Sequence, residues 1–385
     1  MKDKKVSFWT MVAILLLSLS NYTTGSAVSP ALQSMQEAFW HMPTYMIKLT
    51  VSLPAIAIIP TSLVAGKLAG RLSNRRMALT GLFVYLVGGV GAFFVSDLVA
   101  VLLFRVLLGV GAGMIIPLSV SLIGKHFFGD ERTRMTGYST ATASFGAAFL
   151  TLLAGLLAEI SWRHVFLLYA VMLPVFVLVY LFVEDAPGKE DVWVKKQGLN
   201  MDVIKGSLYM FLITTLLFSM YLYVANLMSL KNLGGPREAG LVLLLPNISG
   251  ILVGYYFCHI KRVCRYQLGP LGLLMMALGF YLLGSANSLW GLCLGVTLNG
   301  LGTGVINPLN YLRVVNAVSE SEFAFTIAIA NSFLYLGQFA STLIYEGLLG
   351  LGWLHGIAHL FWFNGVLCTL GAFFFAVRRQ WGKRE

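Results

Sequence analysis

Residues 103–117 read LFRVLLGVGAGMIIP, and residues 299–308 read NGLGTGVINP. Both stretches contain three glycines in alternate positions and a proline four residues after the last of them. The four positions of the second stretch follow those of the first at one offset, 191 residues (300 less 109). A repeat of this length indicates a chain built from two similar halves. The matching residues are Gly109 with Gly300, Gly111 with Gly302, Gly113 with Gly304 and Pro117 with Pro308.

The composition of the chain is that of a membrane protein. Hydrophobic residues make up 58% of the 385 positions and charged residues only 11%, whereas soluble domains carry about 25% charged residues. Twelve apolar segments each approach or exceed the roughly 20 residues that a membrane-spanning helix needs. We therefore expect an all-α membrane protein with helices over 8–31, 46–69, 77–95, 98–124, 136–158, 163–183, 206–230, 240–260, 267–285, 289–312, 324–346 and 355–377.

The longest polar connection lies at the middle of the chain, over residues 184–205. It contains Pro187 and Gly188, which are typical of linkers. The sequence thus predicts an N-terminal six-helix lobe over 1–183, a cytoplasmic linker over 184–205 and a C-terminal six-helix lobe over 206–385.

The net charge of +11 is distributed unevenly between the two sides of the predicted membrane segments. Alternating connections hold 22 Lys and Arg residues on one side and four on the other, and the remaining cation is Arg105. Such a split follows the positive-inside rule and predicts that both termini face the cytoplasm. Since membrane topology explains the excess of Lys and Arg, the net charge does not indicate nucleic-acid binding, and we expect no nucleic acid as a partner.

Arg105 is the one cation that lies away from the ends of an apolar segment, about 10 Å below the outer start of its predicted helix. A charge in hydrocarbon is costly unless it meets water or a partner. Arg105 therefore either faces a cavity, where it organises binding or coupling, or extends to the outer surface. All sixteen acidic residues lie in loops or at segment ends, so no carboxylate is expected in the middle of the membrane.

Polar side chains recur at helical spacing in five segments. Such stripes either join helices by hydrogen bonds or line water, and their presence in both halves favours a shared aqueous cavity. The expected substrate-contacting residues are Asn21, Tyr22, Ser26, Arg105, Tyr138, Thr142, Tyr223, Asn226, Asn299, Asn307, Asn331, Tyr335 and Gln338.

No catalytic or metal-binding pattern stands out in the sequence. His355 and His359 have a metal-compatible spacing but lack a third ligand, and Cys258, His259 and Cys264 lie beside basic residues. We expect no metal, no cofactor and no enzymatic activity.

The chain resembles the major facilitator superfamily across nearly its full length, and two motifs carry this resemblance. The stretch from Gly66 to Arg76 resembles the cytoplasmic Gly-x-Leu-Ala-Asp-Arg-x-Gly-Arg-Arg signature, with Gly70 in place of the usual Asp. Arg105, Gly109 and Gly111 match the Arg-x-x-x-Gly-x-Gly motif of the fourth helix. The resemblance implies twelve helices in two pseudo-symmetric lobes that admit substrate from each side alternately. It also implies coupling or conformational roles for Arg105, Gly66, Arg71, Arg75, Gly109 and Gly113.

These features together predict a secondary active transporter. We expect proton-coupled export of a small organic molecule, as in a drug or metabolite antiporter, with neutral or anionic cargo because of Arg105. The alternatives are an uncoupled facilitator, an importer of a small polar solute or a lysolipid transporter, and more remotely a membrane enzyme or receptor. The expected setting is a monomer in the bacterial inner membrane, with protons and the small-molecule substrate as its partners.

Overall fold

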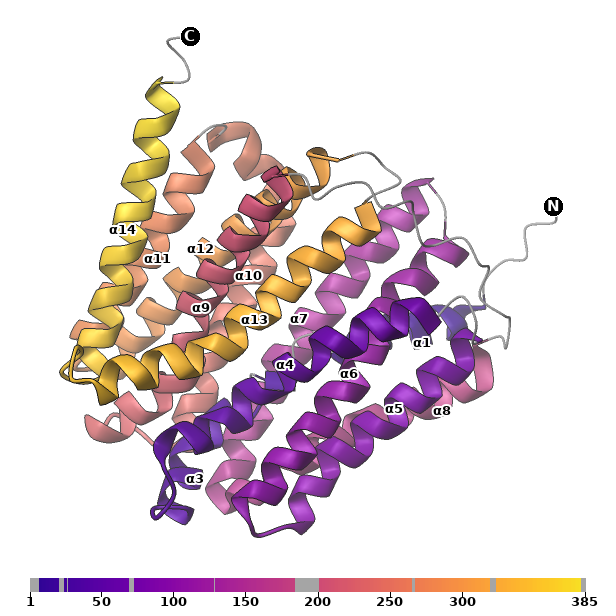
Figure 1. Cartoon of the computed structure of the whole chain (residues 1–385), viewed down its shortest axis with the longest axis horizontal. Coiled ribbons are helices and arrows are strands. Elements are labelled where there is room, and N and C mark those ends of the chain that lie inside the picture. Colours follow the sequence, from indigo (N-terminus) through magenta and orange to yellow (C-terminus); the bar gives the residue numbers. More distant parts are fainter. Residues whose placement is uncertain are drawn as a thin grey trace.

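The computed structural model describes residues 7–20, 24–25, 27–68, 73–127, 129–183, 201–264, 267–318 and 323–381. The first half contains α1 (Phe8–Leu17), η1 (Ser29–Ala31), α3 (Leu32–Ala38), α4 (Thr44–Leu68), α5 (Asn74–Gly91), η2 (Ala92–Phe94), α6 (Leu98–His126), α7 (Gly129–Ile160), η3 (Trp162–Val171) and α8 (Met172–Phe182). The second half contains α9 (Met201–Leu230), α10 (Pro236–Cys264), α11 (Leu268–Ser285), α12 (Leu289–Asn316), α13 (Phe323–Gly350) and α14 (Ile357–Trp381). Figure 1 shows the two halves side by side.

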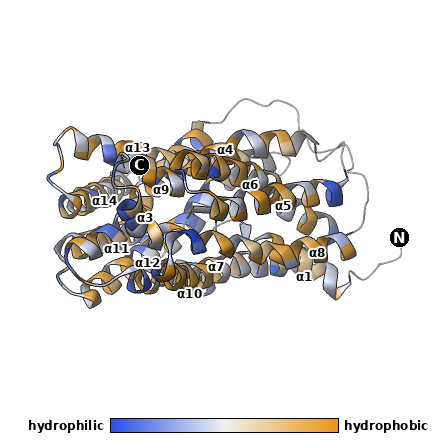
Figure 2. Ribbon diagram, turned by 90° about the horizontal axis from the view of Figure 1, so that it is seen from below, coloured by the Kyte–Doolittle hydropathy of each residue, from blue (hydrophilic) through white to orange (hydrophobic). Residues whose placement is uncertain are grey.

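The helices have the length and surface that a bilayer requires. Among the described residues, eleven helices are long and apolar enough to cross a membrane, and α1 is a shorter apolar helix of 10 residues. Large apolar side chains point outward, with exposed fractions of 60% for Phe83, 76% for Phe94 and 69% for Phe373. Hydrophobic colour runs along most of the helical surface in Figure 2. The prediction of an all-α membrane fold is confirmed.

The first membrane segment differs from the sequence prediction, because it is not one helix over 8–31. Helix α1 ends at Leu17, about 15 Å from its start and so near half the hydrocarbon thickness. Beyond it, the N–H groups of Ser18 and Leu19 donate to carbonyls three residues back. Pro30 at the start of η1 has no N–H to continue a helix. The prediction of a continuous first helix was therefore wrong.

Two other predicted boundaries also change. The sixth segment, expected over 163–183, is divided into the 3₁₀ helix η3 and the α-helix α8. Helix α9 begins at Met201, inside the region expected to be linker. Most of that linker, 184–200, lies outside the described residues, so the predicted division into lobes and linker stays a prediction. Below, first lobe and second lobe are names for the described residues up to 183 and from 201 onward.

Each half contains the same close approach of a glycine to a proline. A Cβ atom on Gly109 of α6 would lie 2.9 Å from the Cα of Pro54 in α4. A Cβ atom on Gly300 of α12 would lie 2.5 Å from the Cα of Pro246 in α10. Real Cβ atoms do not approach this closely, so only glycine allows these backbones to pack. The repeated glycines therefore set the helix contacts α4–α6 and α10–α12.

The molecule has two ends, which we name from the chain. The termini side holds the start of α1 and the end of α14. The far side holds the start of α4 and the end of α13, as well as the end of α7 and the start of α10. The lobes meet along the pairs α4–α13 and α7–α10, and Figure 1 shows α4 and α13 running across the front of the molecule.

Candidate functional site

Arg105 is completely buried within the first lobe, with 0% of its surface exposed. Its Nε atom donates to the carbonyl of Thr50 at 2.5 Å, and its Nη2 atom donates to the carbonyl of Thr24. Its Nη1 atom donates to the hydroxyl of Tyr169 at 2.6 Å. All of these partners belong to the first lobe. In this conformation the guanidinium therefore neither faces an open cavity nor reaches the outer surface.

Arg105 donates to two backbone carbonyls that lack a backbone N–H donor, because the helical segments that contain them are interrupted. In α4 the Thr50 carbonyl lacks its usual donor because residue 54 is a proline. In the first segment the Thr24 carbonyl lacks its usual donor because the N–H of Val28 bonds to Gly25 instead, at 3.4 Å. A bare carbonyl in the membrane interior is costly. Arg105 thus stabilises both interruptions at once, and its expected role as a substrate contact stays a prediction.

A second charged cluster joins the two lobes on the far side; sequence reasoning named its Tyr223 as a substrate contact, which stays a prediction, and missed its Lys48 and Glu346. Lys48 of α4 is 3% exposed, and its Nζ atom lies 2.6 Å from Oε1 of Glu346 in α13. The hydroxyl of Tyr223 in α9 donates to the same carboxylate oxygen at 2.7 Å. The Lys48 ammonium also lies 3.6 Å from the centre of the Tyr223 ring. One carboxylate thus holds a cation from the opposite lobe and a phenol from its own.

Three further contacts hold the far side of the lobe interface together. The hydroxyls of Ser52 and Thr342, one turn along α4 and α13 from the charged pair, lie 2.7 Å apart. The amide of Asn226 in α9 donates to Gln36 of α3 at 2.8 Å. On the other flank, a Cβ atom on Gly155 of α7 would lie 2.9 Å from the Cα of Gly240 in α10. The lobes therefore touch along both flanks of the far side, which closes it.

Behind Tyr223, a buried polar chain runs through the second lobe. The Tyr345 ring packs edge-on against the Tyr223 ring, with ring centres 6.1 Å apart. The Tyr345 hydroxyl donates to Asn364 of α14 at 2.8 Å, and the Asn364 amide donates to Ser219 of α9 at 2.8 Å. This chain fixes α9, α13 and α14 around the charged cluster.

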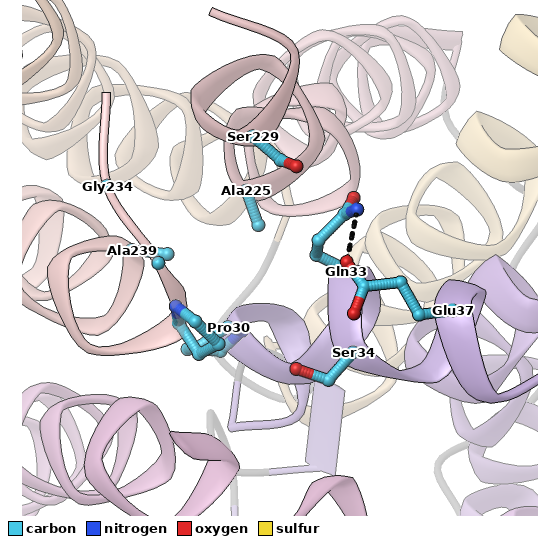
Figure 3. A pocket seen from close by; sticks show the side chains of 10 residues that line it. Pro30, Gln33, Ser34, Glu37, Ala225, Ser229, Gly234 and Ala239 are labelled. Atoms are coloured by element: carbon cyan, nitrogen blue, oxygen red, sulfur yellow. Dashed lines mark hydrogen bonds between the residues drawn. The ribbon is translucent and has the colours of Figure 1, made fainter. Parts of the chain in front are cut away.

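A hollow of about 400 Å³, open to solvent, lies on the far side between the lobes. Figure 3 shows η1 and α3 of the first lobe facing α9 and α10 of the second across it, with Gln33 donating to Glu37 at 3.0 Å. The lining combines small, apolar and polar side chains without a deep enclosed space. We regard it as a vestibule outside the closed interface; it is lined by Pro30, Gln33, Ser34, Glu37, Ala225, Ser229, Gly234, Gly235, Pro236 and Ala239.

The predicted polar stripes meet one another mainly through contacts between helices. Ser18 at the end of α1 bonds to Ser139 of α7, and the Tyr311 hydroxyl donates to Asn331. Gln338 of α13 crosses to the other lobe, since a Cβ atom on Gly25 would lie 2.5 Å from its amide nitrogen. These contacts agree with the alternative in which the polar stripes join helices by hydrogen bonds. The shared aqueous cavity stays a prediction.

The other predicted residues lie in different surroundings, from fully buried to exposed. Asn299 is fully buried and donates to the carbonyl of Gly295 within α12. Tyr138 is 57% exposed, and Thr142, Asn307 and Tyr335 are half-buried. Asn21, Tyr22, Ser26 and Arg71 lie outside the described residues. Gly66 lies in the last turn of α4. Gly113 packs on α4, where a Cβ atom on it would lie 2.8 Å from the Cβ of Thr61. The Arg75 guanidinium lies 4.8 Å from the centre of the Tyr180 ring.

No group of three or more His, Cys, Asp or Glu side chains suited to a metal ion occurs in the described parts of the chain. The His355 and His359 rings lie edge to face, with centres 6.1 Å apart. They pack on each other in the way that aromatic pairs commonly do.

Two helical lobes that meet along a shared interface are typical of secondary membrane transporters. The family model of the Major Facilitator Superfamily matches residues 14–342, and the chain belongs to this family. Members of this family transport small molecules across membranes.

Relatives and solved structures agree with this assignment. The chain is 23% identical over 177 residues to the multidrug transporter protein MdtP of Bacillus subtilis, covering 45% of this chain and 30% of that protein. It is 33% identical over 148 residues to the cephamycin export protein CmcT of Amycolatopsis lactamdurans, covering 37% and 29%. The chain thus spans less than a third of these two relatives. A D-xylose-proton symporter has the same fold, with a TM-score of 0.78, 17% identity and coverage of 96% and 97%.

Proposed function

We propose that this protein is a secondary active exporter of small organic molecules that works by alternating access. The observation that carries the proposal is the closure of the far side, where Lys48 and Glu346 join the lobes at 2.6 Å. A transporter of this family alternates by rocking two lobes about a central site. The present conformation corresponds to the state closed at one side of the membrane.

The direction of closure follows from the charge distribution. The predicted connections on the termini side hold 22 cations against four on the far side. By the positive-inside rule, the termini side faces the cytoplasm and the far side faces outward. The structure is then the outward-closed state of a multi-pass inner-membrane protein, which we take to act as a monomer.

The proposed cargo is a small neutral or anionic molecule of the drug or metabolite type. Similarity to a multidrug transporter and to a cephamycin export protein supports export. The argument for anionic cargo from Arg105 is weakened, because its donors are taken by two carbonyls and a phenol.

Proton coupling is the proposed source of energy, and uptake is the second candidate. A symporter of D-xylose and protons shares the fold, and it supports the use of protons as well as the possibility of import. The fold itself serves both directions.

The experiment is a ligand-stabilisation screen of the purified protein, followed by transport of the best ligand in proteoliposomes with and without a pH gradient. Export driven by protons predicts that a proton gradient accelerates movement of the ligand against its concentration. Counterflow at the same rate with and without the pH gradient would indicate an uncoupled facilitator and not a proton-driven exporter. No movement under any gradient would contradict transport of that ligand class.

A further inference from the structure

We propose that Glu346 is a proton-binding site on the outer side of the protein, and that a proton bound there unlocks the closed lobes. The proposal rests on the proposed function only in that the lobes alternate and the far side faces outward. It assigns no role in carrying protons across the membrane.

The first step is that the ion pair belongs to one conformation. Lys48 is on α4 in the first lobe, whereas Glu346 and Tyr223 are in the second lobe. When the far side opens, the lobes separate, and the Lys48 ammonium must leave the carboxylate. Both charges then meet water instead of each other. The pair therefore forms only when the far side is closed.

The second step is that the closed state requires an ionised carboxylate. Oε1 of Glu346 lies within hydrogen-bond distance of both the Lys48 ammonium and the Tyr223 hydroxyl. A proton on the carboxyl group removes the negative charge and leaves the Lys48 ammonium buried without a counter-charge, which is strongly unfavourable. Opening relieves that cost because Lys48 becomes hydrated. Proton binding and opening of the far side are therefore thermodynamically linked.

The third step is that, in the part of the chain that the structure describes, no other ionisable group in contact with the carboxylate offsets this loss. Lys48 from α4 and Tyr223 from α9 are the titratable groups that the described contacts of Glu346 include. Tyr345, on the same helix as Glu346, lies behind Tyr223 and bonds to Asn364. The Glu346 side chain keeps 17% of its surface exposed, whereas Lys48 keeps 4%. A proton can thus reach the carboxylate, while the ammonium stays enclosed.

The linkage also separates this site from a proton carrier. A carried proton must remain bound while the outer side closes, but closure here brings Glu346 onto Lys48 as a charged pair. The proton therefore returns to outer water before the lobes close. Glu346 senses the outer pH, and any proton that crosses the membrane uses another group.

The test measures the distance between the lobes as pH changes. Spin labels replace Trp40, which is 83% exposed between α3 and α4, and Trp353, which is 74% exposed between α13 and α14. The host protein lacks Cys258, Cys264, Cys293 and Cys368, and it is held in lipid nanodiscs. Spectra are recorded between about pH 8 and about pH 4, which spans the titration of a carboxylic acid.

Four proteins separate the explanations. The parent should shift from the short to the long distance on acidification. Glu346→Gln, which mimics the protonated acid, should favour the long distance at every pH by about 10- to 100-fold in the population ratio. Lys48→Met/Glu346→Leu, which removes both charges, should keep the short distance without pH dependence. Glu238→Gln, which changes a different far-side acid that bonds to the N–H of Gly235, should respond to pH like the parent.

Two results would overturn the proposal. One is a parent distance that does not change with pH, and the other is a pH response in Glu346→Gln equal to that of the parent. If Glu346→Gln fails to fold, the double variant decides, because its retained pH response would equally exclude Glu346. Transport is assayed separately, so a protein that changes distance but moves no ligand would refute the proposed function and leave the proton site standing.

Discussion

An Arg105→Met substitution keeps the length of the side chain and removes all of its N–H donors. The Thr50 carbonyl then loses its Arg105 donor, whereas the Thr24 carbonyl keeps a long bond of 3.5 Å from the Tyr169 hydroxyl. Leaving a buried acceptor unpaired costs about 1–3 kcal/mol. The Thr50 carbonyl therefore costs this full amount and the Thr24 carbonyl a part of it, about 2–4 kcal/mol together, which is offset in part because a buried charge is also removed. We predict a net loss of about 1–3 kcal/mol in the free energy of unfolding.

The position of Pro54 allows this explanation to be tested by rescue. Alanine at position 54 has the N–H group that proline lacks, and this group can donate to the Thr50 carbonyl within α4. Pro54→Ala should therefore recover about 1–2 kcal/mol in the Arg105→Met background. Pro60→Ala is the matched control, because it changes another proline in the same helix whose freed carbonyl belongs to Ile56 and not to Thr50.

The assay is reversible unfolding of the purified protein in mixed micelles, analysed as a double-mutant cycle. The expected result is a coupling energy between positions 105 and 54 and none between 105 and 60. An Arg105→Met protein as stable as the parent would refute the role of Arg105 in holding the two interruptions. Equal effects of the two proline substitutions would refute the specific link to Thr50.

Three further predictions concern packing and the closed interface. Gly109→Ala places a Cβ 2.9 Å from the Cα of Pro54 and should cost about 1–3 kcal/mol in thermal unfolding, whereas Gly250→Ala, with nothing within 4 Å, should be nearly neutral. Gly155→Ala should push α7 from α10 and lengthen the spin-label distance across the far side; an unchanged distance would contradict the close contact. Tyr345→Phe loses its bond to Asn364 and should cost about 0.5–1.5 kcal/mol in the same unfolding assay; full stability would show that the bond contributes nothing.

The sequence predicted the architecture well because the signals involved are long. Apolar segments of about 20 residues and a 191-residue repeat of glycines depend on composition and spacing, which a chain displays directly. The interruption of the first segment after Leu17 was missed because hydropathy averages over a window and does not register a local change in hydrogen bonding. The residues around it, including Ser18, Ser20 and Pro30, did contain a signal, since small polar side chains compete for backbone bonds and proline lacks a donor.

The charged cluster was harder to predict than the fold. Lys48 and Glu346 each lie near the end of an apolar segment, where a charge normally meets water, and they are 298 positions apart in the chain. Only the packing of α4 against α13 brings them together. A usable signal was the shared spacing, since Lys48 and Ser52 on one helix match Glu346 and Thr342 on the other, each pair four residues apart.

For Arg105, the sequence identified the residue as unusual but did not predict what surrounds it. Sequence reasoning expected Arg105 either to face a cavity or to extend to the outer surface. The buried contacts of the guanidinium predict a loss of stability when Arg105 is replaced. The partners are backbone carbonyls, which every residue has, so their availability depends on where the helices are broken and not on any side chain.

Transport by alternating access requires that the far side opens. Cysteines at positions 52 and 342, where the hydroxyls of Ser52 and Thr342 lie 2.7 Å apart, would form a disulfide across the closed interface in a protein without its native cysteines. The oxidised protein in proteoliposomes should move no ligand, and reduction of the disulfide should restore transport. Transport at the same rate by the oxidised and the reduced protein would contradict alternating access.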